Sequence, residues 1–243
     1  MIRRAPYIFA YMPYDQTNFE TGCYKFSDLL RKLSAVSDYT RGYKVLTNEE
    51  ATLTGEGLDP IHDMDEVIAF LRNLHFETGI EPVMNSVWGE RWIDGRQITN
   101  ISYRWGGRQG DNFQRLEYEK WGGIIQSEGA GLNLWLRIVE TIINWKYPQF
   151  LWCGDDAYFR KGKGVFNPDR TIANWFCWTP QQVDPDLIPS AALVRPMLDG
   201  TLIVTSEQYF NIDDEAAIHR ANDVEVEMNE AGILPSLDDL RKV

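Results

Sequence analysis

The stretch DGTLIVTSEQYFNIDDEAAIHRANDVEVEMNEAGILP, residues 199–235, carries the clearest secondary-structure signals in the chain. It opens with Asp199-Gly200, a turn dipeptide. Residues 201–205 follow as a short run of β-branched and apolar side chains, which predicts a strand buried on both faces. Asn211 is placed to cap the next helix, because its short side chain can accept hydrogen bonds from the first-turn N–H groups. Gly232 suits the left-handed residue that ends many helices.

The predicted helix has two faces of opposite character. Its apolar stripe, at spacings of three and four, consists of Ala217, Ala221, Val224, Met228 and Ala231. Asp223, Glu227 and Glu230 form an acidic stripe. Asp213, Asp214 and Glu215 lie near the N-terminal end, where the helix dipole favours negative charge. The acidic face is either a solvated helix surface or an anionic surface that docks onto a basic partner.

Composition narrows the class of protein. The chain has 243 residues, 44% of them hydrophobic, so it can bury a substantial core and is not a disordered protein. The formal net charge of −12 repels phosphate backbones, which argues against direct nucleic-acid binding and favours cationic partners.

Cysteine usage and the first residues bear on the compartment. The three cysteines form no CxxC pair, so neither a zinc site nor a disulfide framework is indicated. The apolar run that follows Met1 is too short for a signal peptide or a membrane span. We expect a cytoplasmic, soluble protein without a membrane anchor.

The order of the remaining patterns predicts the fold class. Strands are expected at residues 7–11, 83–88, 97–105, 113–118, 150–153 and 175–178. Helices are expected from a capping box at Thr17 and Glu20, after Asp63, and from Ser127, whereas residues 37–60 look irregular and residues 168–196 look like proline-rich extended connections. We therefore predict a single α+β domain over residues 1–243, with a mixed or antiparallel sheet packed against several helices.

Catalytic chemistry has one candidate centre. Asp155 and Asp156 lie near Lys161 and Lys163, and carboxylates beside lysines could hold a divalent metal and a water for a metal-assisted hydrolase. A charged turn is the simpler interpretation, because adjacent loop residues rarely converge without further ligands. Nine tryptophans leave a carbohydrate-binding module as another alternative. The three histidines form no ligand spacing, and we predict no catalytic residue, metal or cofactor.

Two regions carry a resemblance to a known family. They are YIFAYMPYDQTNFETGCYKFSDLLRKLSAV, residues 7–36, and the stretch 199–235 quoted above. Together they resemble the immunity protein 52 family of bacterial polymorphic-toxin systems over about a third of the chain.

The resemblance implies an α+β protein encoded beside a secreted toxin. Family members neutralise that toxin by binding it and are not enzymes, and the usual partner has a restriction-endonuclease-like nuclease domain, often delivered by type VI secretion. A nuclease presents a positive surface to DNA, which an acidic protein can occupy. We accordingly expect a basic cognate toxin as partner, with these candidate interface residues: Asp155, Asp156, Asp213, Asp214, Glu215, Asp223, Glu227 and Glu230.

Overall fold

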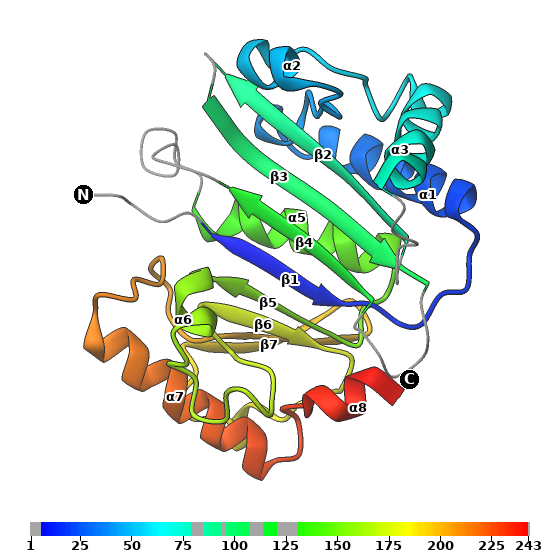
Figure 1. Ribbon diagram of the computed structural model, residues 1–243. Coiled ribbons are helices and arrows are strands. Elements are labelled where there is room, and N and C mark those ends of the chain that lie inside the picture. Colours follow the sequence, from blue (N-terminus) through cyan, green and yellow to red (C-terminus); the bar gives the residue numbers. More distant parts are fainter. Residues whose placement is uncertain (1–5, 79–84, 94–95, 107–113, 121–130, 243) are drawn as a thin grey trace.

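The chain forms one sheet with helices on both of its faces (Figure 1). The computed structural model describes residues 6–78, 85–93, 96–106, 114–120 and 131–242. Within them an eight-stranded sheet has the order β2-β3-β4-β1-β5-β6-β8-β7, and every neighbouring pair is antiparallel. The α+β prediction is confirmed, and of its two alternatives the antiparallel sheet is the correct one.

The element bounds show which predicted segments fold as expected. The strands are β1 (Tyr7–Tyr11), β2 (Asn85–Ile93), β3 (Arg96–Trp105), β4 (Arg115–Lys120), β5 (Phe150–Gly154), β6 (Phe176–Thr179), β7 (Leu193–Met197) and β8 (Gly200–Val204). The helices are α1 (Phe19–Ser34), α2 (Glu49–Thr54), α3 (Met64–Thr78), α5 (Leu132–Trp145), α6 (Asp156–Arg160), α7 (Glu215–Glu230) and α8 (Leu237–Lys242), with 3-10 turns η1 (Asp38–Thr40) and η2 (Pro185–Leu187). The predicted helix start at Ser127 lies outside the described residues.

The strand nearest the N-terminus lies in the middle of the sheet. β1 pairs with β4 on one side and with β5 on the other, so that Tyr7 is opposite both Glu119 and Gly154. Side chains alternate along it: Ile8 and Ala10 face one layer of helices, and Phe9 faces the other. β1 therefore joins the two halves of the sheet.

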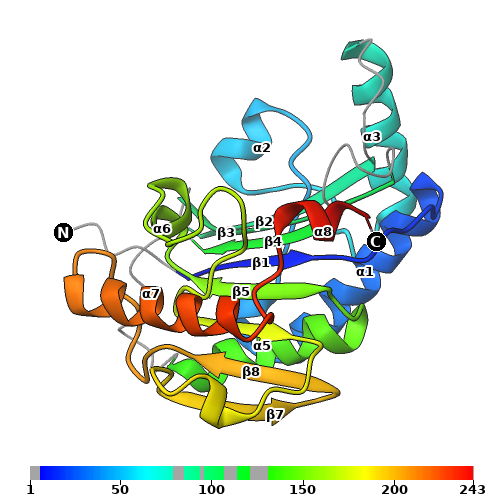
Figure 2. The same cartoon turned by 90° about the horizontal axis from the view of Figure 1, so that it is seen from below.

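Different helices cover the two faces (Figure 2). On one face, Trp135 of α5 meets Tyr118 of β4 edge-to-face, with ring centroids 5.9 Å apart. α1 lies on the same side, with Gly22 so close to the Trp105 ring that a Cβ would overlap it. The other face carries α6, α7 and α8, and there the Met228 sulfur of α7 lies 3.8 Å from the Cys177 sulfur of β6.

Three local predictions need correction. The capping box at Thr17 is wrong, because Asn18 caps α1 by accepting from Thr21 N at 2.8 Å. Residues 37–60 contain a helix, α2, which Asn48 caps. The proline-rich segment contains β7, an edge strand at the end of the sheet. Pro196 has no backbone N–H to donate, and an edge strand tolerates this because it is paired on one side only.

Tryptophan side chains fill much of the core. Of the tryptophans in the described ranges, five are fully buried: Trp105, Trp135, Trp152, Trp175 and Trp178. Trp88, Trp92 and Trp145 are partly buried. Among the described helices, none has the length and apolar character needed to cross a lipid bilayer.

Candidate functional site

The N-terminal end of α7 is built by two successive polar turns. Asp214 caps the helix, its side chain accepting from Ala216 N at 3.0 Å. The Asn211 side chain instead accepts from Asp213 N at 3.1 Å, one turn earlier, so the prediction that Asn211 is the cap is wrong. Gly232 adopts the predicted left-handed conformation, with φ of +71°.

The predicted two-faced character of α7 is present. Ala221, Val224 and Met228 are buried, and Ala217 and Ala231 pack partly buried against the same core. On the opposite side the exposed acids are Asp213, Asp214, Glu215, Asp223 and Glu230. None of these five carboxylates forms an ion pair within the described part of the chain. We call these five residues the α7 acidic surface.

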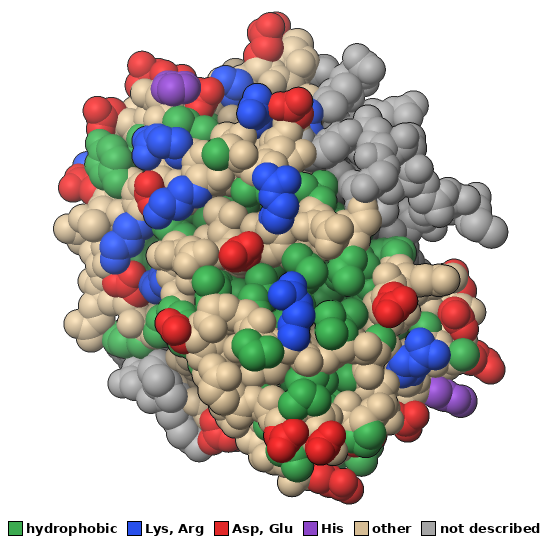
Figure 3. Space-filling model, turned by 180° about the vertical axis from the view of Figure 1, so that it is seen from behind, with side chains coloured by type: hydrophobic (Ala, Val, Ile, Leu, Met, Phe, Trp, Pro, Cys, Tyr) green, Lys and Arg blue, Asp and Glu red, His purple; other side chains and the backbone are tan. Residues whose placement is uncertain are grey.

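The face that carries α1 and α5 shows a different charge arrangement. In Figure 3, Lys and Arg side chains are mixed with acidic ones there, and hydrophobic side chains gather in the lower half of the view. Several bases around α1 are paired: Lys25 with Asp15 at 2.9 Å and Lys32 with Asp28 at 2.6 Å. Charge on that face is therefore largely compensated, whereas the α7 acidic surface is not.

Glu227 is only partly available to a partner. It is half-buried, and its carboxylate accepts from Ser190 N at 3.0 Å and from Ser190 Oγ at 2.6 Å. These bonds attach α7 to the segment that leads into β7. The residue thus has a structural role that its position on the predicted acidic stripe did not indicate.

Asp155 and Asp156 do not converge on one site. Asp155 is 3% exposed and caps α6 by accepting from Ala157 N at 2.8 Å, so it presents little surface to a partner. The Asn174 side chain bonds both the N–H and the C=O of Asp155. Asp156 is half-buried and pairs with Arg160 at 2.6 Å. Within the described residues, no three His, Cys, Asp or Glu side chains group as metal ligands would.

Glu225 is a buried acid that sequence reasoning did not single out. It is fully buried on α7 and accepts from Val165 N at 2.9 Å, from Ala173 N at 3.0 Å and from Tyr158 OH at 3.1 Å. Burial raises the pKa of Glu225 to about 7, against the opposing effect of these three donors. The helical spacing carried a signal, since Glu225 lies four residues after Ala221, on the apolar side of the helix.

A cleft of about 260 Å³ opens on the sheet face that carries α6 and α8. It lies where β1, β4 and β5 meet α6 and α8, and its lining combines aromatic, acidic and basic side chains: Tyr7, Phe9, Tyr11, Arg115, Glu117, Trp152, Asp156, Phe159, Arg160 and Leu237. Of these residues, only Asp156 was predicted as a site residue. The period-two aromatics of residues 7–11 were the available sequence signal.

Aromatic rings form the floor of the cleft. The Phe9 and Trp152 rings stack nearly parallel, at 4°, with centroids 5.8 Å apart. The Arg115 guanidinium lies 5.8 Å from the Phe9 centroid, and its Nε is 2.5 Å from Glu117 Oε1. Tyr7 OH donates to the other Glu117 oxygen. The cleft thus already holds one guanidinium between a ring and a carboxylate.

Glu119 lies near this cleft, opposite Tyr7 in the pairing of β4 with β1. It shares a face of β4 with Glu117 and is half-buried. Burial raises its pKa, the carboxylates of Asp156 and Glu117 raise it further, and Arg160 opposes them. Among the described residues, its side chain has neither a hydrogen bond nor an ion pair.

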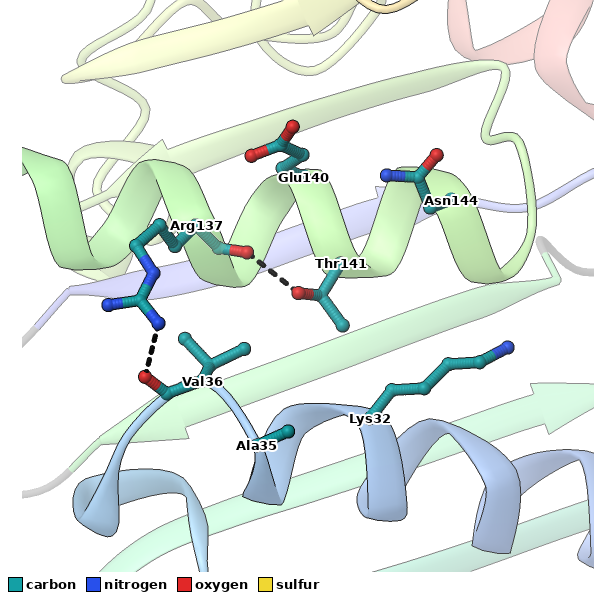
Figure 4. Close-up of a pocket in the computed structure, with 7 residues that line it drawn as sticks. All are labelled: Lys32, Ala35, Val36, Arg137, Glu140, Thr141 and Asn144. Carbon is teal, nitrogen blue, oxygen red and sulfur yellow. Dashed lines mark hydrogen bonds between the residues drawn. The ribbon is translucent and has the colours of Figure 1, made fainter.

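A larger groove, of about 440 Å³, lies between the end of α1 and α5 (Figure 4). Its cations already have local partners: Arg137 Nη2 donates to Val36 O at 2.6 Å, and Lys32 pairs with Asp28. The Arg137 bond links α5 to the segment that follows α1, whereas the Lys32–Asp28 pair lies within α1. The groove therefore offers fewer unsatisfied groups than the aromatic cleft.

Comparison with known proteins yields a likeness in fold. No model of a known protein family matches the chain, and no curated protein matches it in sequence. The structure is similar to that of a Pseudomonas aeruginosa T6SS protein, PA0821, with a TM-score of 0.53 and 13% identity, over 91% of this chain and 72% of that one. At this identity the similarity shows a shared fold, and the resemblance to the immunity protein 52 family stays a prediction.

Proposed function

We propose that this protein is an immunity protein that binds a cognate secreted toxin and blocks it stoichiometrically, without catalysis or a cofactor. The observation that carries the proposal is the α7 acidic surface. Its five exposed carboxylates have no ion-pair partner within the described residues, in a protein of net charge −12. Such a surface attracts and orients a basic protein.

The exposed charge affects the rate at which the two proteins meet as well as the contacts that they form. Uncompensated surface charge accelerates association with an oppositely charged protein, and salt screens the effect. A nuclease that acts on nucleic acid presents a basic surface, so an acidic protein placed there competes with the substrate. The nuclease class of toxin rests on the resemblance to the immunity protein 52 family.

The shared fold supports the type VI secretion setting. The structurally similar Pseudomonas aeruginosa protein is described as a T6SS protein. A nuclease toxin would act on nucleic acid in the cytoplasm, so we place this protein there as part of the proposal.

The two alternatives have less support. A hydrolase centred on Asp155 and Asp156 would need carboxylates free to hold a metal, yet Asp155 is a buried helix cap and Asp156 pairs with Arg160. A carbohydrate-binding module would need exposed tryptophans, and each described tryptophan is buried or partly buried.

The test is co-expression with the product of the neighbouring gene, followed by measurement of growth and of binding kinetics. We expect the wild-type protein to restore growth. The variant D213K/D223K/E230K should associate about ten-fold more slowly or worse at low salt, with a smaller difference at high salt. Failure of the wild-type protein to bind any neighbouring gene product would contradict the proposal.

A matched control separates the α7 acidic surface from net charge. E50K/E56K/E66K reverses three exposed acids at the opposite end of the molecule, around α2 and α3 (Figure 1). Both triple variants change the net charge equally. Equal slowing by the two would show that total charge, and not the α7 acidic surface, governs association.

A further inference from the structure

We propose that the edge of the molecule formed by η2 and β7 holds the apolar anchor of the toxin contact, in the side chains of Leu187 and Leu193. We call these two residues the leucine edge. The inference rests on the proposed function, because it takes the basic toxin as the partner. It goes further by naming the contact that prolongs the complex, whereas the α7 acidic surface sets the rate at which the two proteins meet.

Both leucines are accessible on the folded protein. Leu187 is 51% exposed and Leu193 is 38% exposed. Leu187 belongs to η2 and Leu193 to β7, and η2 packs against β7, which lies at the outer edge of the sheet (Figure 2). Leucines exposed singly are common on protein surfaces and need no special function. These two differ because their segments are adjacent, firmly held and accompanied by acids.

The turn that carries Leu187 is fixed on both sides of this residue. Before it, Asp184 caps η2 by accepting from Asp186 N at 3.1 Å, and Pro185 occupies the first position of the turn with a restricted backbone. Directly after it, Ile188 is buried in the core. A side chain on a fixed turn loses little freedom on binding, so its burial contributes more to affinity.

A bond between Glu227 and Ser190 joins this segment to α7. The Glu227 carboxylate accepts from Ser190 N at 3.0 Å and from Ser190 Oγ at 2.6 Å. Asp223 lies four residues before Glu227 and Glu230 three residues after it, so all three are on the same side of the helix. The leucine edge therefore adjoins the α7 acidic surface, and one partner can cover both.

Acids also accompany the leucines on their own segment. Asp184 and Asp186 are exposed on either side of Pro185, and within the described residues neither forms an ion pair. Together with the acids of α7 they outnumber Arg195 of β7 and Arg220 of α7. An apolar centre with an acidic rim fits an apolar patch on the toxin that lysines and arginines surround.

A second copy of this chain is a poor occupant of the leucine edge. Two β7 strands would extend the sheet by backbone hydrogen bonds, and Pro196 in β7 has no N–H to donate. Two acidic rims of the same kind also repel each other. The basic partner of the proposed function has complementary charge, so we assign the leucine edge to it.

The first test measures the kinetics of toxin binding for Leu187→Ala and for L187A/L193A. Leu187→Ala should raise the Kd about ten-fold, chiefly through faster dissociation, and the double variant should raise it further. The association rate should stay within about two-fold of the wild-type value, because no charge changes. The matched control is Tyr24→Ala on α1, which removes another exposed apolar side chain and should leave toxin binding unchanged.

The second test concerns the fixed position of the turn. Ser190→Ala removes the Oγ bond to Glu227 and changes neither the net charge nor the leucines. We expect the toxin to dissociate about three-fold faster. Hydrogen exchange at Leu187 N, which donates to Asp184 O at 3.0 Å, should also become faster. Unchanged exchange together with unchanged dissociation would show that the bond to α7 does not hold the anchor in place, and this part of the inference would be wrong.

The outcomes separate this inference from the proposed function. If the wild-type protein neutralises the toxin and L187A/L193A binds it equally well, the leucine edge is not the anchor and the immunity function stands. An equal loss of binding in Tyr24→Ala would overturn the inference too, because exposed apolar area in general would then explain the effect. If the wild-type protein binds no neighbouring gene product, both proposals fail. Thermal unfolding of each variant should match that of the wild-type protein, since the leucines are exposed.

Discussion

The two halves of the sheet differ in the number of faces that are covered. β5, β6 and β8 are buried along their whole length, between helices on both sides, whereas β3 and β4 alternate buried and more exposed residues. Acidic side chains in the two halves also differ in how many hydrogen-bond donors surround them. Glu225, which faces the covered half from α7, is enclosed by three donors, whereas Glu119 on the open half has no partner among the described residues. The covered half therefore contributes strands that are buried on both faces, whereas the open half leaves part of its side chains exposed.

The largest effect should come from removing a large side chain in the covered half. Trp178 on β6 is fully buried, and its Nε1 donates to Met197 O at 3.0 Å. We expect Trp178→Ala to lower the free energy of unfolding by about 3–5 kcal/mol because it leaves a large cavity. Trp88→Ala on the open half should cost about 1 kcal/mol, since Trp88 is only partly buried. Urea unfolding measures both, and equal losses would contradict the difference between the halves.

The titration of Glu225 should give the next largest change in the free energy of unfolding. Its pKa is about 7 in the folded protein and near the ordinary 4.5 in the unfolded chain, so the native state binds the proton more tightly. The resulting stabilisation is complete below pH 4.5 and is lost as the pH rises to about 7, a change of about 3 kcal/mol in the free energy of unfolding.

The measurement is urea unfolding at several pH values for the wild-type protein and for Glu225→Gln. The difference between the two proteins should shrink or reverse across this pH range, because glutamine does not titrate. Glu230→Gln, an exposed neighbour on the same helix, serves as the control. A pH profile unaffected by Glu225→Gln would show that this carboxyl does not titrate between these limits.

The smallest expected effect concerns the cap of α7. Asp214→Ala should cost about 1 kcal/mol of unfolding free energy, because it removes the acceptor for Ala216 N. Asn211→Ala should cost less than about 0.5 kcal/mol, because its bond to Asp213 N lies outside the helix in an exposed turn. Thermal unfolding of both variants tests the order, and a larger loss for Asn211→Ala would restore the cap expected from the sequence.

Sequence patterns predicted most strands in both halves of the sheet, but they missed an edge strand and a helix cap. The apolar run before α7 predicted a strand buried on both faces, and β8 is such a strand. A strand buried on both faces has apolar residues at consecutive positions, which makes it easy to recognise in the sequence. The cap of α7 was misplaced because Asn211 and Asp214 are equally competent to cap, and packing selects between them. β7 was missed because its Pro196 is compatible with an edge strand only, and the sequence does not state which strand lies at the edge.

The site residues were harder to predict, because their environment is assembled from distant segments. Asp155 looked like part of an exposed charged turn, yet its burial depends on Asn174, which bonds its backbone from nineteen residues later. The cleft combines Phe9, Glu117 and Trp152, which only the sheet brings together. Helical spacing could have identified Glu225 as buried, but not the donors around it.

The central position of β1 affects how the chain folds during translation. Tyr7 leaves the ribosome early, but the strands that flank it, at Glu119 and Gly154, are made more than a hundred residues later. Contacts so distant along the chain slow folding, and an apolar segment that waits for them is prone to aggregate or to engage chaperones. β1 therefore gains both of its neighbouring strands only in molecules whose translation has passed β5.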